Sequence, residues 1–342
     1  MHSSALARLS SSFALSVAVL ACGSDSSNTT SAGDGGPGSN PFPSGCAPTC
    51  PVTNVAHGGY QPTSLVVYGD RVFFTAVSTS SASGIYSVPK AGGDAKKLAA
   101  ASAGGSACKG LATDGTLVYY ADQGITSGLA GIYSVPVDGG TPTKLVATAG
   151  NVGCIAMDDS SLYWLGPGPK GVTGVSKMAK SGGDSTALVT TGAGFKDITV
   201  RKGIVYWAES NYVRKVSATG GDSITLTSDN HAGFSSIAVD DAFVYVENYA
   251  DATIARVPLD GGARETLAKA QTTPHGLTVD GTSLYWGVNL NDNTQDRVVR
   301  GSTTGDFITP LTSSVNATNF AVDEQYVYWT SVNEGAIRRT PK

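Results

Sequence analysis

His275 is the residue of this chain whose type and surroundings best suit acid–base chemistry. It stands in Thr-Pro-His-Gly-Leu, directly before a short apolar run that reads as a strand. An imidazole titrates near neutral pH, and it acts as a general acid or base when a partner group lies within hydrogen-bond reach. In an enzyme, we expect a carboxylate such as Glu247 or Glu209, or an Asn side chain, to supply that partner.

Familiar catalytic motifs are absent. The sequence contains no His-Glu-x-x-His, no Gly-x-Ser-x-Gly, no phosphate-binding loop and no Cys-x-x-Cys. The other histidines, His2, His57 and His231, fall in the N-terminal segment or in connections between repeats. We therefore assign no catalytic residue, keep His275 as the candidate, and favour a binding protein over an enzyme.

The segment Asn289–Asp296 has oxygen-bearing side chains at alternate positions, a spacing that could serve a hard cation. It departs from a calcium loop, because Thr294 replaces the turn glycine and Arg300 takes the place of the closing glutamate. We expect no cofactor and no metal, with a divalent cation in this segment as the alternative.

A repeat determines the elements that carry these residues. With Asp240 as the reference, an equivalent position recurs every 39 to 46 residues. Val or Leu stands four residues after each reference position, an aromatic residue stands five after it, and all four tryptophans stand six after it. The seven reference positions are Tyr68, Asp114, Asp158, Arg201, Asp240, Asp280 and Asp323. The recurrent Asp residues open tight turns, where we expect them to accept local backbone N–H groups rather than to bind a ligand.

Each repeat reads as four strands: a triplet before the reference position, the Val-Tyr-Trp run, a third strand such as 84–89, and a short fourth strand after a Gly-Gly turn. Four strands in about 40 to 45 residues indicate a blade of a β-propeller. The seventh repeat lacks a fourth strand, and the segment 51–56 has the pattern to replace it and close the ring. We predict seven blades, with six as the alternative.

Asp323 with Val-Tyr-Trp-Thr at 327–330, and Val-Pro-Leu-Asp-Gly-Gly at 257–262, resemble the repeats of YWTD, NHL and TolB-like propellers. The resemblance covers residues 51–342. The fourth letter of YWTD is not kept, so the structural role of that Asp does not carry over. The resemblance implies the fold, because propellers host binding, scaffolding and catalysis alike.

The loops between second and third strands vary in length, whereas the turns on the opposite face are short. Variable loops on a rigid scaffold are where binding normally occurs. Propellers of the virginiamycin B lyase and gluconolactonase classes keep their active sites at this mouth of the channel, so a lyase or hydrolase around His275 is the alternative function. The residues expected on the binding face are Asp122, Glu209, Glu247, Asn248, Asn289, Asp292, Asn333 and Glu334.

The first 21 residues carry one Arg and an apolar run too short to cross a membrane. The run ends in Val-Leu-Ala-Cys, which resembles the lipobox of bacterial lipoproteins and implies cleavage after Ala21 and lipidation of Cys22. Residues 22–45 form a Ser/Gly/Pro-rich linker, and 46–342 form the propeller. We expect a lipid-anchored protein on the outer membrane or cell surface, or facing the periplasm.

Four further cysteines stand in a chain that we expect to be exported, where disulfides persist. Of the three possible pairings, adjacency along the chain and in neighbouring repeats favours Cys46–Cys50 and Cys108–Cys154.

Composition excludes some partners. Only 15% of the 342 residues are charged and the net charge is -4, which argues against nucleic acid. We predict a monomeric propeller anchored to a membrane that binds protein or glycan through its variable loops.

Overall fold

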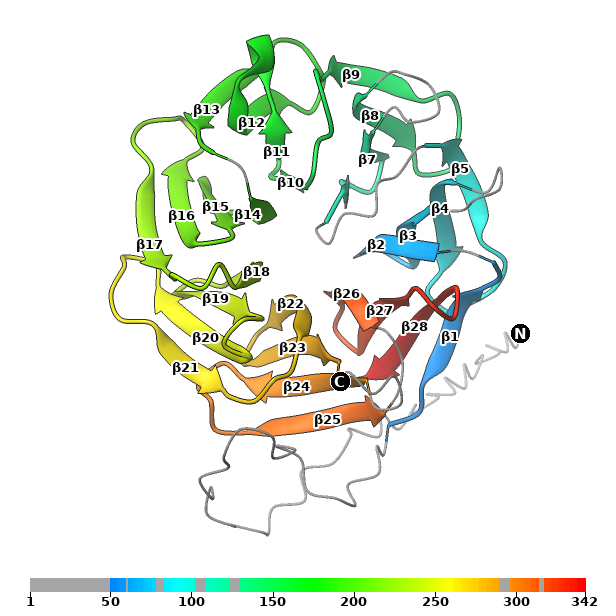
Figure 1. Ribbon diagram of the computed structural model, residues 1–342. Helices are drawn as coiled ribbons and strands as arrows, with labels where there is room; N and C mark the ends of the chain where they lie inside the picture. Colours follow the sequence, from blue (N-terminus) through cyan, green and yellow to red (C-terminus); the bar gives the residue numbers. More distant parts are fainter. Residues whose placement is uncertain are drawn as a thin grey trace, which may run out of the picture.

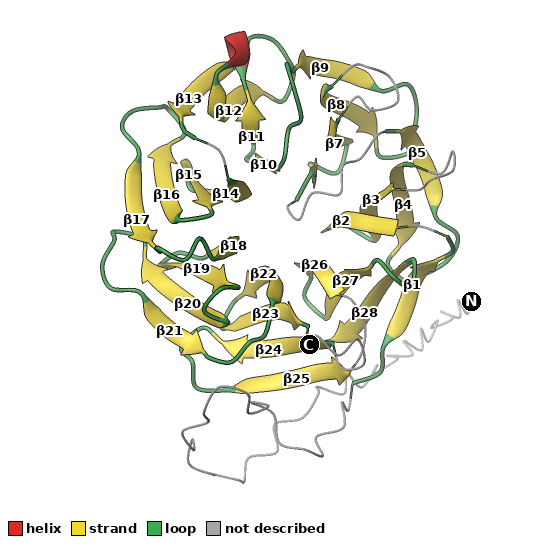
Figure 2. Cartoon of the chain, viewed as in Figure 1, coloured by secondary structure: helices red, strands yellow, loops and turns green. Residues whose placement is uncertain are grey.

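Seven antiparallel sheets of four strands stand around a central axis (Figure 1). The computed structural model describes residues 50–59, 61–77, 83–101, 109–123, 130–192, 194–289, 296–313 and 317–342. Strands make up nearly all regular structure in these residues, with one 3-10 turn, η1 (Pro169–Gly171) (Figure 2). The prediction of a seven-bladed propeller is confirmed, and the six-bladed alternative is excluded.

The blades follow one another along the chain. Blade 1 comprises β2 (Gln61–Tyr68), β3 (Arg71–Val77), β4 (Gly84–Pro89) and β5 (Lys96–Ala100). Blade 2 comprises β6 (Leu111–Thr113), β7 (Leu117–Asp122), β8 (Gly131–Pro136) and β9 (Thr143–Ala147). Blade 3 comprises β10 (Ile155–Met157), β11 (Ser161–Pro167), β12 (Thr173–Ala179) and β13 (Thr186–Thr190). Blade 4 comprises β14 (Phe195–Arg201), β15 (Ile204–Glu209), β16 (Tyr212–Ser217) and β17 (Ile224–Ser228).

The remaining three blades complete the circle. Blade 5 comprises β18 (Phe234–Val239), β19 (Phe243–Asn248), β20 (Thr253–Pro258) and β21 (Glu265–Ala268). Blade 6 comprises β22 (Pro274–Asp280), β23 (Ser283–Val288), β24 (Arg297–Ser302) and β25 (Ile308–Ser313). Blade 7 comprises β26 (Ala317–Val322), β27 (Tyr326–Ser331), β28 (Ala336–Pro341) and, from the other end of the chain, β1 (Thr53–His57).

The β1 strand closes the ring as the sequence predicted. It pairs antiparallel with β28, with Thr53 opposite Arg339 and His57 opposite Ala336, and the two strands lie side by side in blue and red in Figure 1. Val55 is only 1% exposed. The edge of β28 is therefore covered by the chain itself, which removes an open sheet edge.

The core lies between neighbouring blades. Second strands are apolar on both faces because each blade packs against two others. Tyr163 of blade 3, for example, packs in one cluster with Val205 and Trp207 of blade 4. All four tryptophans are at most 1% exposed, so their shared register places them in the core, as expected.

The recurrent Asp residues hold the turns between first and second strands. Asp158 Oδ1 accepts the backbone N–H groups of Ser160 and Ser161 at 2.9 and 2.8 Å, while its Oδ2 accepts the Tyr163 hydroxyl at 2.7 Å. Burial opposes ionisation of this carboxyl, but the hydrogen bonds outweigh burial and lower its pKa. The same arrangement recurs at Asp114, Asp240 and Asp323. The structural interpretation is confirmed for these four residues, whereas the Asp280 carboxylate pairs with Lys342.

Cys50 and Cys154 are each disulfide-bonded. Cys46 and Cys108 lie outside the described residues, so the expected pairing stays a prediction. The expected signal peptide, Cys22, the linker and Asp292 also lie outside them. Among the described residues, no helix is long and apolar enough to cross a membrane.

Candidate functional site

A cavity of about 530 Å³ lies at the channel mouth on the variable-loop face. It is formed where the innermost strands β18, β22, β26 and β2 begin and where β19 and β27 end. Four consecutive blades, 5, 6, 7 and 1, therefore build it. The lining residues are Ser235, Ser236, Glu247 and Tyr249 from blade 5, Thr273, Pro274, His275 and Gly276 from blade 6, Thr318, Asn319 and Val332 from blade 7, and Thr63 from blade 1.

Close contacts between blades shape the cavity wall. Asn319 donates a hydrogen bond from Nδ2 to the carbonyl oxygen of Thr63 at 2.6 Å, which joins blade 7 to blade 1. Gly276 has φ +73°, and a Cβ atom there would lie 2.2 Å from the carbonyl oxygen of Thr318. Only glycine fits this conformation and this approach, so Gly276 brings blade 6 against blade 7 at the cavity.

Glu247, the last residue but one of β19, is the charged group of the cavity. Its side chain is 1% exposed, and its Oε1 accepts a hydrogen bond from the Ser235 hydroxyl at 2.5 Å. Its Oε2 makes no hydrogen bond. Burial, with a contribution from the charge of Asp197, raises the pKa of Glu247 to about 8, although the Ser235 hydroxyl and the nearby amides of Gly276 and Leu277 favour its charged form.

A second buried acid, Asp197, stands next to the cavity wall. Its Oδ2 accepts hydrogen bonds from the Ser236 hydroxyl and the Ile237 amide, both at 3.1 Å. Burial raises the pKa of Asp197, while the charge of Lys109 opposes that shift. Sequence reasoning missed this residue. The available signal was its position immediately before the first strand triplet of its repeat, where the other repeats carry Ser, Gly, Cys or Asn.

His275 lines the same cavity, as its place near the channel mouth suggested. Burial lowers its pKa, and a hydrogen bond with the Pro274 backbone opposes that shift. Among the described residues, no carboxylate or Asn side chain hydrogen-bonds the His275 ring. Glu247 lines the same cavity as His275. The Glu209 carboxylate is not part of this cavity and hydrogen-bonds Trp207 and Thr191 instead. The partnered histidine that we expected of an enzyme is therefore not formed.

The other residues predicted for the binding face are largely engaged in structure. Glu209 is 6% exposed, and its Oε1 accepts the Trp207 indole N–H at 2.8 Å and the Thr191 hydroxyl at 2.6 Å. Glu334 pairs with Arg338 at 2.9 Å. Among the predicted face residues that are described, only Glu247 lines the cavity. Of the rest, Asp122 and Asn248 are buried, Asn289 is half-buried and Asn333 is exposed.

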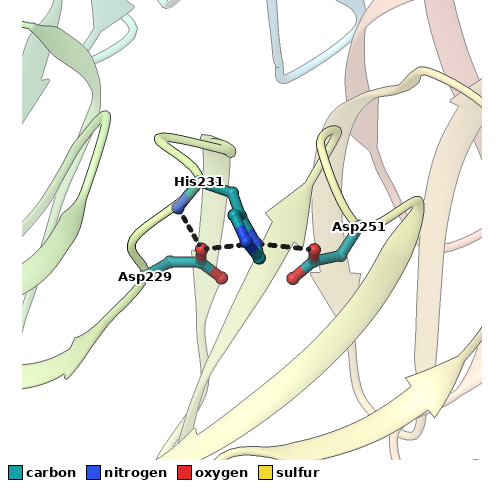
Figure 3. Close-up of side chains that lie close together, drawn as sticks. All are labelled: Asp229, His231 and Asp251. Carbon is teal, nitrogen blue, oxygen red and sulfur yellow. Dashed lines mark hydrogen bonds and ion pairs between the residues drawn. The ribbon is translucent and has the colours of Figure 1, made fainter.

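Asp229, His231 and Asp251 form a separate cluster on blade 5 (Figure 3). His231 Nδ1 lies 3.3 Å from Asp251 Oδ1 and 3.6 Å from Asp229 Oδ1. The second oxygens of both Asp residues receive the Asn248 amide, at 2.7 and 3.0 Å, and Arg264 donates to Asp229 at 3.0 Å.

Among the described residues, this cluster is the donor set that could hold a metal ion, but Arg264 already offsets one of its two carboxylate charges. Sequence reasoning missed it because its residues come from separate loops. Most of the segment proposed for a cation, residues 290–295, lies outside the described part of the chain.

The fold and cavity define a seven-bladed β-propeller with a pocket at the channel mouth. No protein-family model and no curated protein sequence matches the chain. Its fold is similar to that of virginiamycin B lyase from Staphylococcus aureus, with a TM-score of 0.67 at 12% identity over 86% of this chain and 99% of the enzyme.

Two further structures show the same likeness. A streptogramin B lyase has a TM-score of 0.65 at 14% identity, covering 85% of this chain and 96% of that one. A chain of the nidogen/laminin complex has a TM-score of 0.52 at 17% identity, covering 72% and 92%. At these identities the likeness concerns the fold.

Proposed function

We propose that this protein is a binding propeller of the bacterial cell envelope, anchored through lipidated Cys22, and that its ligand enters the cavity at the channel mouth. The observation that carries the proposal is the cavity itself, which four blades build around the buried carboxyl of Glu247. Its volume falls within the range of small-molecule and side-chain sites. The ligand is a protein or a glycan that presents one group to this pocket.

The alternative function, a lyase or hydrolase, would use the same cavity. Glu247 and His275 line one cavity, and two of the structurally similar proteins are lyases. Proton transfer by His275 requires a group that holds and orients its ring, and the described residues provide no such side chain. We therefore favour binding.

The test is a ligand screen by ligand-observed NMR on the full chain in detergent. The mixture contains small amines, carboxylates, neutral sugars and short peptides. The matched variant is Val332→Trp, which fills the cavity from its aliphatic rim. We expect compounds that bind the parent and fail to bind the variant. If Val332→Trp folds and binds every compound as the parent does, the cavity is not the binding site. Chemical turnover of a bound compound, lost in His275→Ala, would instead support the lyase or hydrolase.

A further inference from the structure

Within this proposed function, on which the inference rests, the geometry points to a primary alkylammonium group, as on a lysine side chain of a protein, as the occupant of the cavity beside Glu247. The carboxyl is 1% exposed and lines the cavity. One of its oxygens has no hydrogen-bond partner. A buried acceptor without a partner costs free energy, and a ligand that donates to it recovers that cost.

The charges around the cavity favour a cation. No Lys or Arg is among the lining residues, and Asp197 adds a second carboxyl nearby. Two groups could oppose a cation: Lys109, whose charge acts on Asp197, and His275, whose burial favours its neutral form. Tyr249 at the rim is 45% exposed and offers an aromatic face that tolerates a cation.

The one oxygen without a partner, which is itself buried, favours ammonium over guanidinium. Arginine binds carboxylates best through two parallel hydrogen bonds to both oxygens. Oε1 of Glu247 already accepts the Ser235 hydroxyl, so only Oε2 remains. An ammonium group is a compact charge with three donors, and it needs only one carboxylate oxygen, with hydroxyl oxygens for its other donors. Thr63, Thr273 and Thr318 bring hydroxyls to the lining. Each already makes one hydrogen bond within the protein, and a hydroxyl oxygen with two lone pairs can accept a further donor.

Burial of the carboxyl favours a slender stem. A lysine side chain carries its charge on a flexible four-carbon chain, which can lie against Pro274 and Val332 while the ammonium reaches Glu247. The amine of an amino sugar is attached directly to a ring, which is bulkier at that depth. A protein ligand that inserts a lysine therefore fits the cavity better than an amino-sugar glycan.

The experiment measures binding of Nα-acetyl-lysine methylamide to the full chain by ligand-observed NMR. The norleucine, arginine and glucosamine analogues are run in parallel. We expect the lysine probe to bind, the norleucine analogue not to bind, and the other two to bind at least tenfold more weakly. Glu247→Gln should reduce lysine-probe affinity at least tenfold. Glu265→Gln, which changes an exposed glutamate on the outermost strand of the same blade, should not.

The pH dependence provides a second readout. Because the carboxyl must lose its proton to pair with ammonium, the affinity for the lysine probe should rise about tenfold per pH unit from pH 6 towards pH 8. Glu247→Gln should abolish this dependence. Circular dichroism of both variants tests that they fold.

The outcomes separate this inference from the proposed function. If the lysine probe does not bind, if the norleucine or glucosamine analogue binds equally well, or if Glu247→Gln retains affinity, the ammonium assignment is wrong. The proposed function survives that result as long as Val332→Trp still blocks another compound. If Val332→Trp blocks nothing, both are wrong.

Discussion

At the level of single residues, the turn aspartates differ from the buried acids Glu247 and Asp197 in where their hydrogen-bond partners lie. Asp158 bonds groups two, three and five residues away, so its role follows from sequence distance alone. Glu247 and Asp197 depend on neighbouring blades. The turn aspartates could therefore be interpreted from the sequence. The partners of Asp197 and of the cluster of Asp229, His231 and Asp251 lie in other loops or blades and could not be interpreted in this way.

Glu247 should make stability depend on pH. An acid whose pKa is raised by folding binds its proton more tightly in the folded state, so its contribution is greatest at low pH and is lost as pH rises. For Glu247 the window runs from the ordinary value of 4.5 to about 8. We expect the free energy of unfolding of the parent to fall, relative to Glu247→Gln, by about 1.4 kcal/mol per pH unit within this window. Urea unfolding at several pH values measures it, and parallel curves for the two proteins would contradict it.

The bonds from tyrosine to aspartate should contribute modestly to stability. Tyr163→Phe removes the hydroxyl that donates to Asp158 at 2.7 Å and leaves the ring in the core. We expect a loss of about 1 kcal/mol in the free energy of unfolding, the usual value for one such hydrogen bond. Tyr212→Phe, at a side chain that is 39% exposed, is the control and should change little. Equal effects of the two substitutions would refute a specific role for the bond.

At the scale of the element, strands were predictable because their signals are local and repeated. The Val-Tyr-Trp run recurs in register, and the third strand β4 begins and ends where the sequence placed it. Three of the seven described face residues, by contrast, are buried within the scaffold: Asp122, Glu209 and Asn248. Glu209 is an example, since its bond to Trp207 caps the end of a strand. Loop length predicted the face, but side-chain direction, which depends on neighbouring blades, decided which residues line the cavity.

The closing strand offers a sharp test of the ring. Val55→Asp places a carboxylate at a position that is 1% exposed, between β1 and the blade beside it. We expect a loss of about 3 kcal/mol in the free energy of unfolding because a buried charge without a partner is costly. Val52→Asp, where the side chain is 37% exposed, should change it by less than about 0.5 kcal/mol. Urea unfolding compares the pair, and a similar small effect at both positions would mean that β1 contributes little to the ring.

For the molecule as a whole, the proposed lipid anchor would determine which partners the cavity can reach. A protein tethered through residues 22–45 would present its variable face to partners within reach of that tether. The anchor is read from the four residues that end the first apolar segment, and the propeller structure is independent of it.

Cys22→Ser tests the anchor directly. The substitution removes the thiol that carries the lipid, so we expect metabolic labelling with a fatty acid to be lost. The protein should move from the membrane fraction to the soluble fraction after cell disruption. The folded body should be unaffected, as measured by circular dichroism. A variant that fractionates with membranes as the parent does would contradict the anchor.

The pairing of β1 with β28 also sets the order of the folding steps. These strands are joined by nearly the whole length of the chain, so blade 7 is complete only after β28 has been synthesised, and until then β1 has no partner. The contact is among the most non-local in the molecule, and such contacts form late because loop closure must come first. Folding after export would let the blades form from their local hairpins while the ring stays open. The final step would then be a single docking of the two ends of the chain.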